Sequence, residues 1–105
     1  MRVWLDDLRE APPGWVRVRT PEEAIGLLET GDVTEASLDH DLGLLGGERE
    51  RTGYDVVLWL EREVAEGRWI IPLPEIRVHS ANPVGRARME RAIVSIRRLL
   101  GDTSE

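Results

Sequence analysis

Two short apolar segments of this chain each run directly into aspartates. The segment V-W-L is followed by Asp6 and Asp7, and the segment A-S-L is followed by Asp39, with Asp41 two residues further on. Short apolar runs of this kind are typical of buried strands, so these carboxylates are expected at strand ends. Ligands of an open α/β sheet bind in the crevice beyond the carboxyl ends of its strands. The pattern therefore favours a sheet that gathers acidic side chains at one edge.

Carboxylates gathered in this way repel one another unless a cation or a proton separates them. A hard divalent ion such as Mg²⁺ is the simplest candidate, because it prefers oxygen ligands. The alternative is that Asp6 caps a turn and Asp41 caps a loop, each satisfied by backbone N–H groups. The equivalent placement of the four carboxylates favours a common site.

Turn residues and helix caps divide the chain into alternating strands and helices. Strands are predicted at residues 1–5, 15–19, 36–39 and 76–80. Helices are predicted to begin after the caps Thr20, Thr52 and Asn82. Pro-Pro-Gly between the first two strands excludes a helix there. We expect one α/β domain over residues 1–105, with a mainly parallel sheet of about four strands in the order 2-1-3-4 and no first crossover helix.

The composition narrows the class of protein. The chain of 105 residues suits one domain and has no cysteine, which excludes disulfides, thiolate metal sites and a cysteine nucleophile. No apolar run approaches a membrane span, so a cytoplasmic location is expected. The net charge of −6 argues against broad binding of duplex DNA but allows a small phosphorylated ligand or one strand end. All 14 basic residues are arginine, which suggests a hot-growing or GC-rich source.

The two histidines of the chain stand at predicted strand ends. His40 lies between Asp39 and Asp41, and His79 closes the fourth strand. Two imidazoles at neighbouring strand ends suit acid/base catalysis, and adjacent carboxylates are expected to raise their pKa values. A structural role is the alternative, and the residues alone leave both open.

The start of the last helix is a candidate anion site. Its first turn, from Pro83 to Gly85, is expected to present free backbone N–H groups beside the fourth strand. Arg86 follows, where a cation opposes the helix dipole, so contact with a phosphate explains it better than helix stability. The four tryptophans are expected to pack in the core rather than to stack on bases.

Four motifs span nearly the whole chain. They are L-D-D-x-R at 5–9, S-L-D-H-D-L-G at 37–43, T-G-Y-D-V at 52–56 and V-H-S-A-N-P-x-G at 78–85. Together they resemble the cyclic-phosphate processing receiver-like domains, a reduced relative of response-regulator receivers. The resemblance implies a receiver-like, flavodoxin-like domain of three layers, with an activity on cyclic phosphates of nucleotides or RNA.

The resemblance also implies roles for single residues. Asp6 and Asp7 match the acidic pair that holds Mg²⁺ in receivers, Asp39 matches the phosphoacceptor, and Ser80 matches the switch hydroxyl. Receivers also use a lysine from a fifth strand, whereas this chain has no lysine and no convincing fifth strand. The loss of that group and the gain of two histidines favour an enzyme over a phosphotransfer switch.

We therefore expect a small phosphoesterase that hydrolyses cyclic phosphates, such as the 2′,3′-cyclic phosphate of an RNA end or a nucleotide. The expected residues are Asp6, Asp7 and Asp39 for a metal (Mg²⁺ or Mn²⁺), His40, His79 and Asp41 for proton transfer, and Arg9, Ser80, Asn82 and Arg86 for the substrate. A metal-free mechanism with the histidine pair stays open. The main alternative is a degenerate receiver that binds a nucleotide or a protein partner without turnover, and a phosphotransfer switch comes third.

Overall fold

The computed structural model describes residues 1–39, 52–69 and 72–101. Its elements follow one another as β1 (Arg2–Leu5), β2 (Trp15–Val18), α1 (Pro21–Leu28), β3 (Glu35–Leu38), α2 (Gly53–Ala65), β4 (Glu75–Val78) and α3 (Pro83–Leu99). They correspond to the strands and helices that the sequence predicts.

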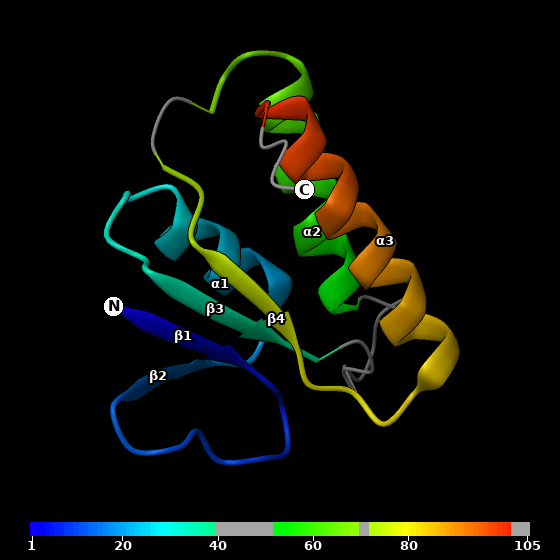
Figure 1. The fold of residues 1–105 in the computed structure, drawn as a ribbon. Helices are drawn as coiled ribbons and strands as arrows, with labels where there is room; N and C mark the ends of the chain where they lie inside the picture. Colours follow the sequence, from blue (N-terminus) through cyan, green and yellow to red (C-terminus); the bar gives the residue numbers. More distant parts are fainter. Residues whose placement is uncertain (40–51, 70–71, 102–105) are drawn as a thin grey trace.

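The strands form one parallel sheet in the order β2-β1-β3-β4, which confirms the predicted order. Figure 1 shows these strands side by side, with β4 next to α3. The connection from β1 to β2 contains no helix, as Pro-Pro-Gly predicts. It closes with a hydrogen bond from the Trp15 N–H to the Pro12 carbonyl, and Gly14 takes a φ of 87°, which only glycine adopts freely.

Each helix begins at the cap that the sequence predicts. The hydroxyl of Thr20 accepts a hydrogen bond from the N–H of Glu23, at 3.2 Å. Thr52 and Asp55 form a reciprocal capping box at the start of α2, and Asn82 caps α3. No helix in the described part of the chain is long and apolar enough to span a bilayer.

One face of the sheet carries the hydrophobic core. Alternate strand residues are buried on this face, namely Val3, Leu5, Val18, Ala36, Leu38 and Ile76. The buried residues of all three helices belong to the same core, and α2 packs against both α1 and α3. The described elements therefore form two layers, so the predicted three-layer arrangement is wrong for them. The second face lacks helices because a first crossover helix is missing and no fifth strand with its helix follows within the described residues.

The opposite, open face of the sheet carries polar and aromatic side chains. Arg2 pairs with Glu35 across β1 and β3, and Arg77 pairs with both Glu35 and Glu75. These pairs are largely exposed and contribute little to stability. No helix covers this face in the described ranges, so side chains that point to it at the strand ends are reachable from outside the core.

Candidate active site

Three residues that directly follow neighbouring strands lie at the same level of the sheet. They are Asp6 after β1, Asp39 after β3 and His79 after β4, and the last residues of these strands are in register. The backbone N–H of each continues the ladder, from Asp6 to Val18 O (3.0 Å), from Asp39 to Leu5 O (3.1 Å) and from His79 to Leu38 O (3.0 Å). Because the preceding residues face the core, these three side chains point to the open face.

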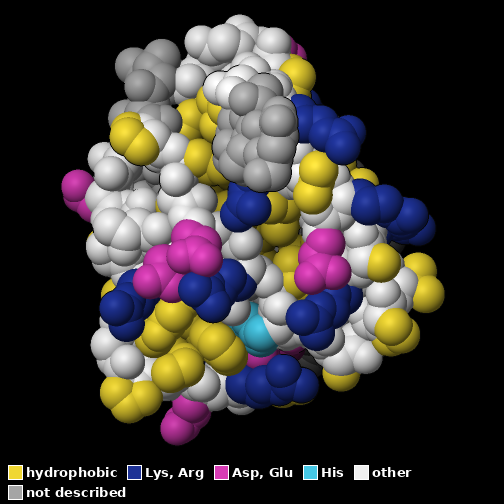
Figure 2. Space-filling view, in the orientation of Figure 1, with side chains coloured by type: hydrophobic (Ala, Val, Ile, Leu, Met, Phe, Trp, Pro, Cys, Tyr) yellow, Lys and Arg dark blue, Asp and Glu magenta, His cyan; other side chains and the backbone are white. Residues whose placement is uncertain are grey.

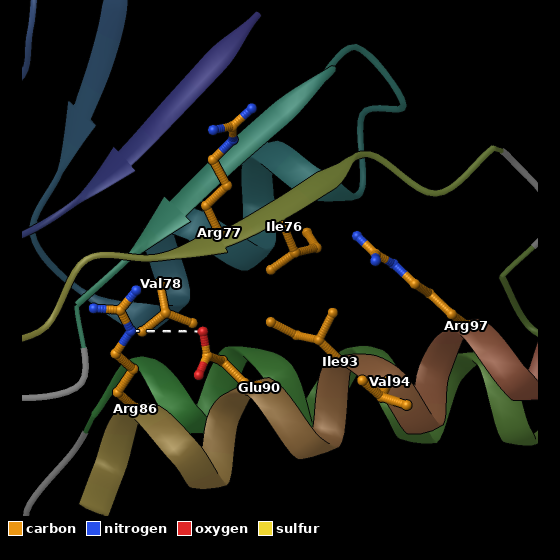
Figure 3. Close-up of a pocket in the computed structure, with 8 residues that line it drawn as sticks. All are labelled: Ile76, Arg77, Val78, Arg86, Glu90, Ile93, Val94 and Arg97. Atoms are coloured by element: carbon orange, nitrogen blue, oxygen red, sulfur yellow. Dashed lines mark ion pairs between the residues drawn. The ribbon is translucent and has the colours of Figure 1, made fainter. Parts of the chain in front are cut away.

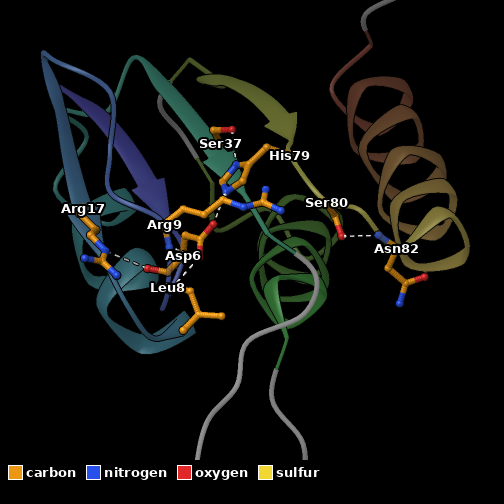
Figure 4. A network of polar contacts seen from close by, with 8 residues as sticks. All are labelled: Asp6, Leu8, Arg9, Arg17, Ser37, His79, Ser80 and Asn82. Carbon is orange, nitrogen blue, oxygen red and sulfur yellow. Dashed lines mark hydrogen bonds and ion pairs between the residues drawn. The ribbon is translucent and has the colours of Figure 1, made fainter.

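Asp6 is a buried carboxylate fixed by its own turn, with 1% of its surface exposed. Its Oδ1 accepts hydrogen bonds from the N–H groups of Leu8 at 2.9 Å and Arg9 at 3.0 Å. Its Oδ2 lies 3.2 Å from Nε2 of His79 (Figure 4). The turn-capping alternative is therefore correct for one oxygen, while the other faces the site.

The environment of Asp6 keeps it ionised. Burial alone raises the pKa of this carboxyl, but the N–H groups of Arg9 and Leu8 lower it, and so does His79. The hydrogen bonds and the contact with His79 together outweigh burial, so the pKa of Asp6 lies below its ordinary value of 3.8. Asp6 is a carboxylate at neutral pH.

The imidazole of His79 is held from three sides. Its Nδ1 lies 2.6 Å from Oγ of Ser37, and its Nε2 faces Asp6. The ring stacks on the indole of Trp4, with centroids 3.7 Å apart and planes 9° apart. Only 14% of the His79 side chain is exposed. These contacts fix both the plane and the direction of the ring.

Burial is the largest influence on the pKa of His79 and lowers it, Asp6 raises it, and the charge of Arg9 lowers it further. The net pKa of His79 lies below the ordinary 6.5. The carboxylate of Asp6 raises this pKa, as predicted, but loss of hydration and the charge of Arg9 together outweigh it. His79 is a neutral imidazole at neutral pH.

The backbone of Asp39 packs against the first residue of α2. A side-chain Cβ at Gly53 would overlap the carbonyl oxygen of Asp39 and would lie 3.3 Å from Cε of Met89. Glycine at this position therefore lets α2 approach the end of β3 and sets where Asp39 stands.

Asp6, Asp39 and His79 bring donor atoms together that could hold a metal ion. One ligand atom from each lies within 4.8 Å of the other two. Two carboxylates suit Mg²⁺ or Mn²⁺, and the imidazole shifts the preference toward Mn²⁺. The donor set therefore suits the predicted kind of ion, with His79 and not Asp7 as its third member. Asp7 is outside this group, because successive side chains of an extended segment point to opposite sides.

The residues predicted to bind substrate divide into two sets. The side chain of Arg9 extends past Asp6 toward His79 (Figure 4). Ser80 and Asn82 serve the start of α3, since Oγ of Ser80 accepts from the N–H of Asn82 at 3.1 Å. Arg9 therefore lies at the carboxylates, whereas the other two build the helix start.

The first turn of α3 differs from its prediction. Oδ1 of Asn82 accepts hydrogen bonds from the N–H groups of Val84 at 3.1 Å and Gly85 at 3.0 Å. These N–H groups are therefore not free for an anion, because the cap uses them. Arg86 is half exposed and pairs with Glu90 four residues on, at 3.5 Å. His40 and Asp41 lie outside the described residues, so their roles stay predictions.

Two residues of the site were not selected from the sequence. Ser37 occurs in one of the four motifs without a predicted role, and Trp4 is predicted to pack in the core. The available signal is spacing, because Ser37 precedes Asp39 by two residues and Trp4 precedes Asp6 by two, so each pair shares a face of the sheet.

A parallel sheet in the order β2-β1-β3-β4, with acidic residues after β1 and β3 and a hydroxyl after β4, defines a receiver-like α/β domain. The family model of the cyclic-phosphate processing receiver domain matches residues 1–95. The chain belongs to this family, as its motifs predicted. Comparison with curated proteins and with solved structures found no match.

Proposed function

We propose that this domain is a metal-assisted phosphoesterase that opens cyclic phosphates, such as a 2′,3′-cyclic phosphate on a ribose. The observation that carries the proposal is the convergence of Asp6, Asp39 and His79, whose donor atoms lie within 4.8 Å of one another. Membership of a family described as cyclic-phosphate processing supports the substrate class.

The reaction adds water across one ester bond. The water oxygen forms a new P–O bond, one P–O bond of the ring breaks, and the freed ribose oxygen takes a proton. The product is a phosphomonoester. A divalent ion held by Asp6, Asp39 and His79 would polarise the phosphoryl oxygens and make the water more acidic.

His79 suits the donor set better than it suits direct proton transfer. With a hydrogen bond to Ser37 at Nδ1 and contact with Asp6 at Nε2, both ring nitrogens are engaged. With a metal ion bound, a neutral imidazole that donates from Nδ1 to the Ser37 hydroxyl would direct the lone pair of Nε2 at the ion instead of donating from Nε2 to Asp6. Ser37 and the Trp4 ring then position His79, and the proton transfers belong to His40 and Asp41 in this proposal.

Arg9 supplies the charge that a phosphate needs. Its guanidinium lies beside His79, close enough to lower the pKa of that imidazole. A fixed cation at this place neutralises charge that develops on the phosphoryl oxygens during ring opening. Arg86, after the cap of α3, is the second candidate for this contact.

The test is product analysis in ¹⁸O-labelled water. The purified chain is incubated with 2′,3′-cyclic and 3′,5′-cyclic nucleotides in Mn²⁺, Mg²⁺ or chelator, and products are resolved by chromatography and mass spectrometry. We expect one ¹⁸O atom in the phosphomonoester, turnover that stops with chelator, and loss of turnover in Asp39→Asn. Binding of a cyclic phosphate without turnover under every condition would instead support the non-catalytic receiver.

A further inference from the structure

Helix α3 carries a charge opposite to that of the whole chain. It has one acidic residue, Glu90, against the five arginines Arg86, Arg88, Arg91, Arg97 and Arg98, which leaves a net charge of +4. The chain as a whole carries −6. Such segregation produces a local positive field that attracts an anionic ligand to one side of an acidic molecule.

A groove of about 410 Å³ lies between β4 and α3. Four apolar side chains, Ile76, Val78, Ile93 and Val94, form its floor, and Arg77 and Glu90 also line it. Arg86 and Arg97 stand at its two ends (Figure 3). The groove thus joins two cations across an apolar floor, with the carboxylate of Glu90 paired to Arg86.

One end of this groove adjoins the candidate active site. Val78 lines the groove, and the next residue is His79. Arg86 lies in the first turn of α3, just beyond the Asn82 cap. Figure 2 shows a histidine surface on this face of the molecule, with arginine side chains around it. Because β4 is the edge strand of the described sheet, a ligand whose phosphate sits at His79 on the open face can pass this edge into the groove.

Helix stability alone does not explain Arg97. A cation in the last turn of a helix is favoured by the helix dipole, and Arg98 meets that need as well. Arg97 instead extends from α3 toward β4 over the groove (Figure 3), and none of the ion pairs between described residues includes it. Its charge is available to a ligand.

The length of the groove sets the size of that ligand. Arg86 and Arg97 are eleven residues apart and share one side of α3, which corresponds to about 16 Å of helix. At about 3.4 Å for each stacked nucleotide, this span accommodates about four or five nucleotides.

We infer that the groove between β4 and α3 binds the single-stranded RNA that leads to the cyclic phosphate, so the preferred substrate is an RNA end rather than a free cyclic nucleotide. This inference rests on the proposed function for the reacting end. Arg97 contacts a backbone phosphate upstream of that end, and the apolar floor receives riboses or bases. An acidic peptide is the competing occupant, and the test separates the two.

The test compares substrates of increasing length. Oligouridylates of one to eight nucleotides with a 2′,3′-cyclic phosphate are assayed for kcat/KM. The matching oligomers with a 3′-phosphate, which contain no cyclic ester to hydrolyse, are assayed for Kd. Arg97→Ala is compared with Arg62→Ala, because Arg62 also stands in the last turn of its helix, α2, but lines no part of the groove.

We expect kcat/KM to rise up to about five nucleotides and then to level off. In Arg97→Ala the ratio of pentanucleotide to mononucleotide kcat/KM falls about tenfold, as loss of one charge-assisted contact implies. The slope of log affinity against log salt falls by about 0.7 for the single strand. Arg62→Ala keeps the ratio and the slope of the original chain.

Three results would overturn the inference. One is turnover that does not depend on length, which leaves the phosphoesterase intact and refutes the groove. Another is an equal effect of Arg97→Ala and Arg62→Ala. The third is competition by a glutamate peptide of matched charge as strong as that by RNA. If no oligomer turns over but 3′-phosphate oligomers bind with the expected length and Arg97 dependence, the groove stands and the proposed reaction fails.

Discussion

Replacing Gly53 with alanine is expected to weaken both the fold and the site. A Cβ at this position would overlap the carbonyl oxygen of Asp39, which is backbone and cannot rotate away. Helix α2 or the end of β3 must shift, and overpacking of this kind costs about 1–3 kcal/mol. Alanine recovers up to about 1 kcal/mol in a helix relative to glycine. Because the overlapped atom belongs to the backbone, the overpacking cost lies toward the upper end of that range, and the expected net loss in the free energy of unfolding is about 1–2 kcal/mol.

The assay is urea denaturation followed by circular dichroism, together with Mn²⁺ binding measured by electron paramagnetic resonance of the free ion. Gly53→Ala should lower the transition midpoint and should weaken Mn²⁺ binding, because Asp39 moves with its carbonyl. Gly26→Ala is the matched control, since Gly26 lies in α1 with nothing within 4 Å of an added Cβ. That variant should gain about 0.5–1 kcal/mol. Stability of Gly53→Ala at or above that of the original chain, with unchanged Mn²⁺ affinity, would refute the reasoning.

The remaining predictions concern His79, Ser37 and the α3 cap. Burial lowers the pKa of His79 in the folded chain below 6.5, so the unfolded chain binds the proton at a higher pH than the folded chain does. The free energy of unfolding therefore falls as the pH drops from about 6.5 toward the folded pKa. His79→Gln should remove this pH dependence of the free energy of unfolding in urea titrations at several pH values. Asp6 changes the free energy of unfolding only at lower pH, as the pH falls toward and below 3.8. Ser37→Ala should weaken Mn²⁺ binding about 10- to 100-fold, and Ser37→Thr, which keeps the hydroxyl, should restore most of it; equal affinities in all three would contradict a positioning role. Asn82→Ala should lower the free energy of unfolding by about 1 kcal/mol through the two lost cap bonds, and an unchanged urea midpoint would argue against that cap.

The strand order could be predicted because local signals agree with it. Caps such as Thr20 and Asn82 mark helix starts, and the Pro-Pro-Gly segment removes the first crossover helix. The number of layers was wrong because analogy with receivers supplied a second helical layer. The sequence carried the opposite signal, since E-A-S-L and E-I-R-V alternate polar and apolar residues, which is typical of a sheet buried on one face only.

The candidate site was predictable in part. Asp6, Asp39 and His79 each follow a strand, and neighbouring parallel strands place such residues together. The stacking of Trp4 on His79 and the bond from Ser37 to its Nδ1 depend on side-chain directions across three strands, which no local pattern encodes. The direction of the His79 pKa shift depends on how far these contacts exclude water, and that follows only from packing.

We propose above that Asp6, Asp39 and His79 form one metal-dependent hydrolytic site. The most direct test is the initial rate of hydrolysis of a 2′,3′-cyclic nucleotide as Mn²⁺ is titrated into the metal-stripped chain and its Asp39→Asn variant. The account predicts a rate that rises and saturates with Mn²⁺ in the original chain and stays near zero in Asp39→Asn. A rate that is the same with Mn²⁺ and with chelator, or that survives Asp39→Asn unchanged, would contradict it.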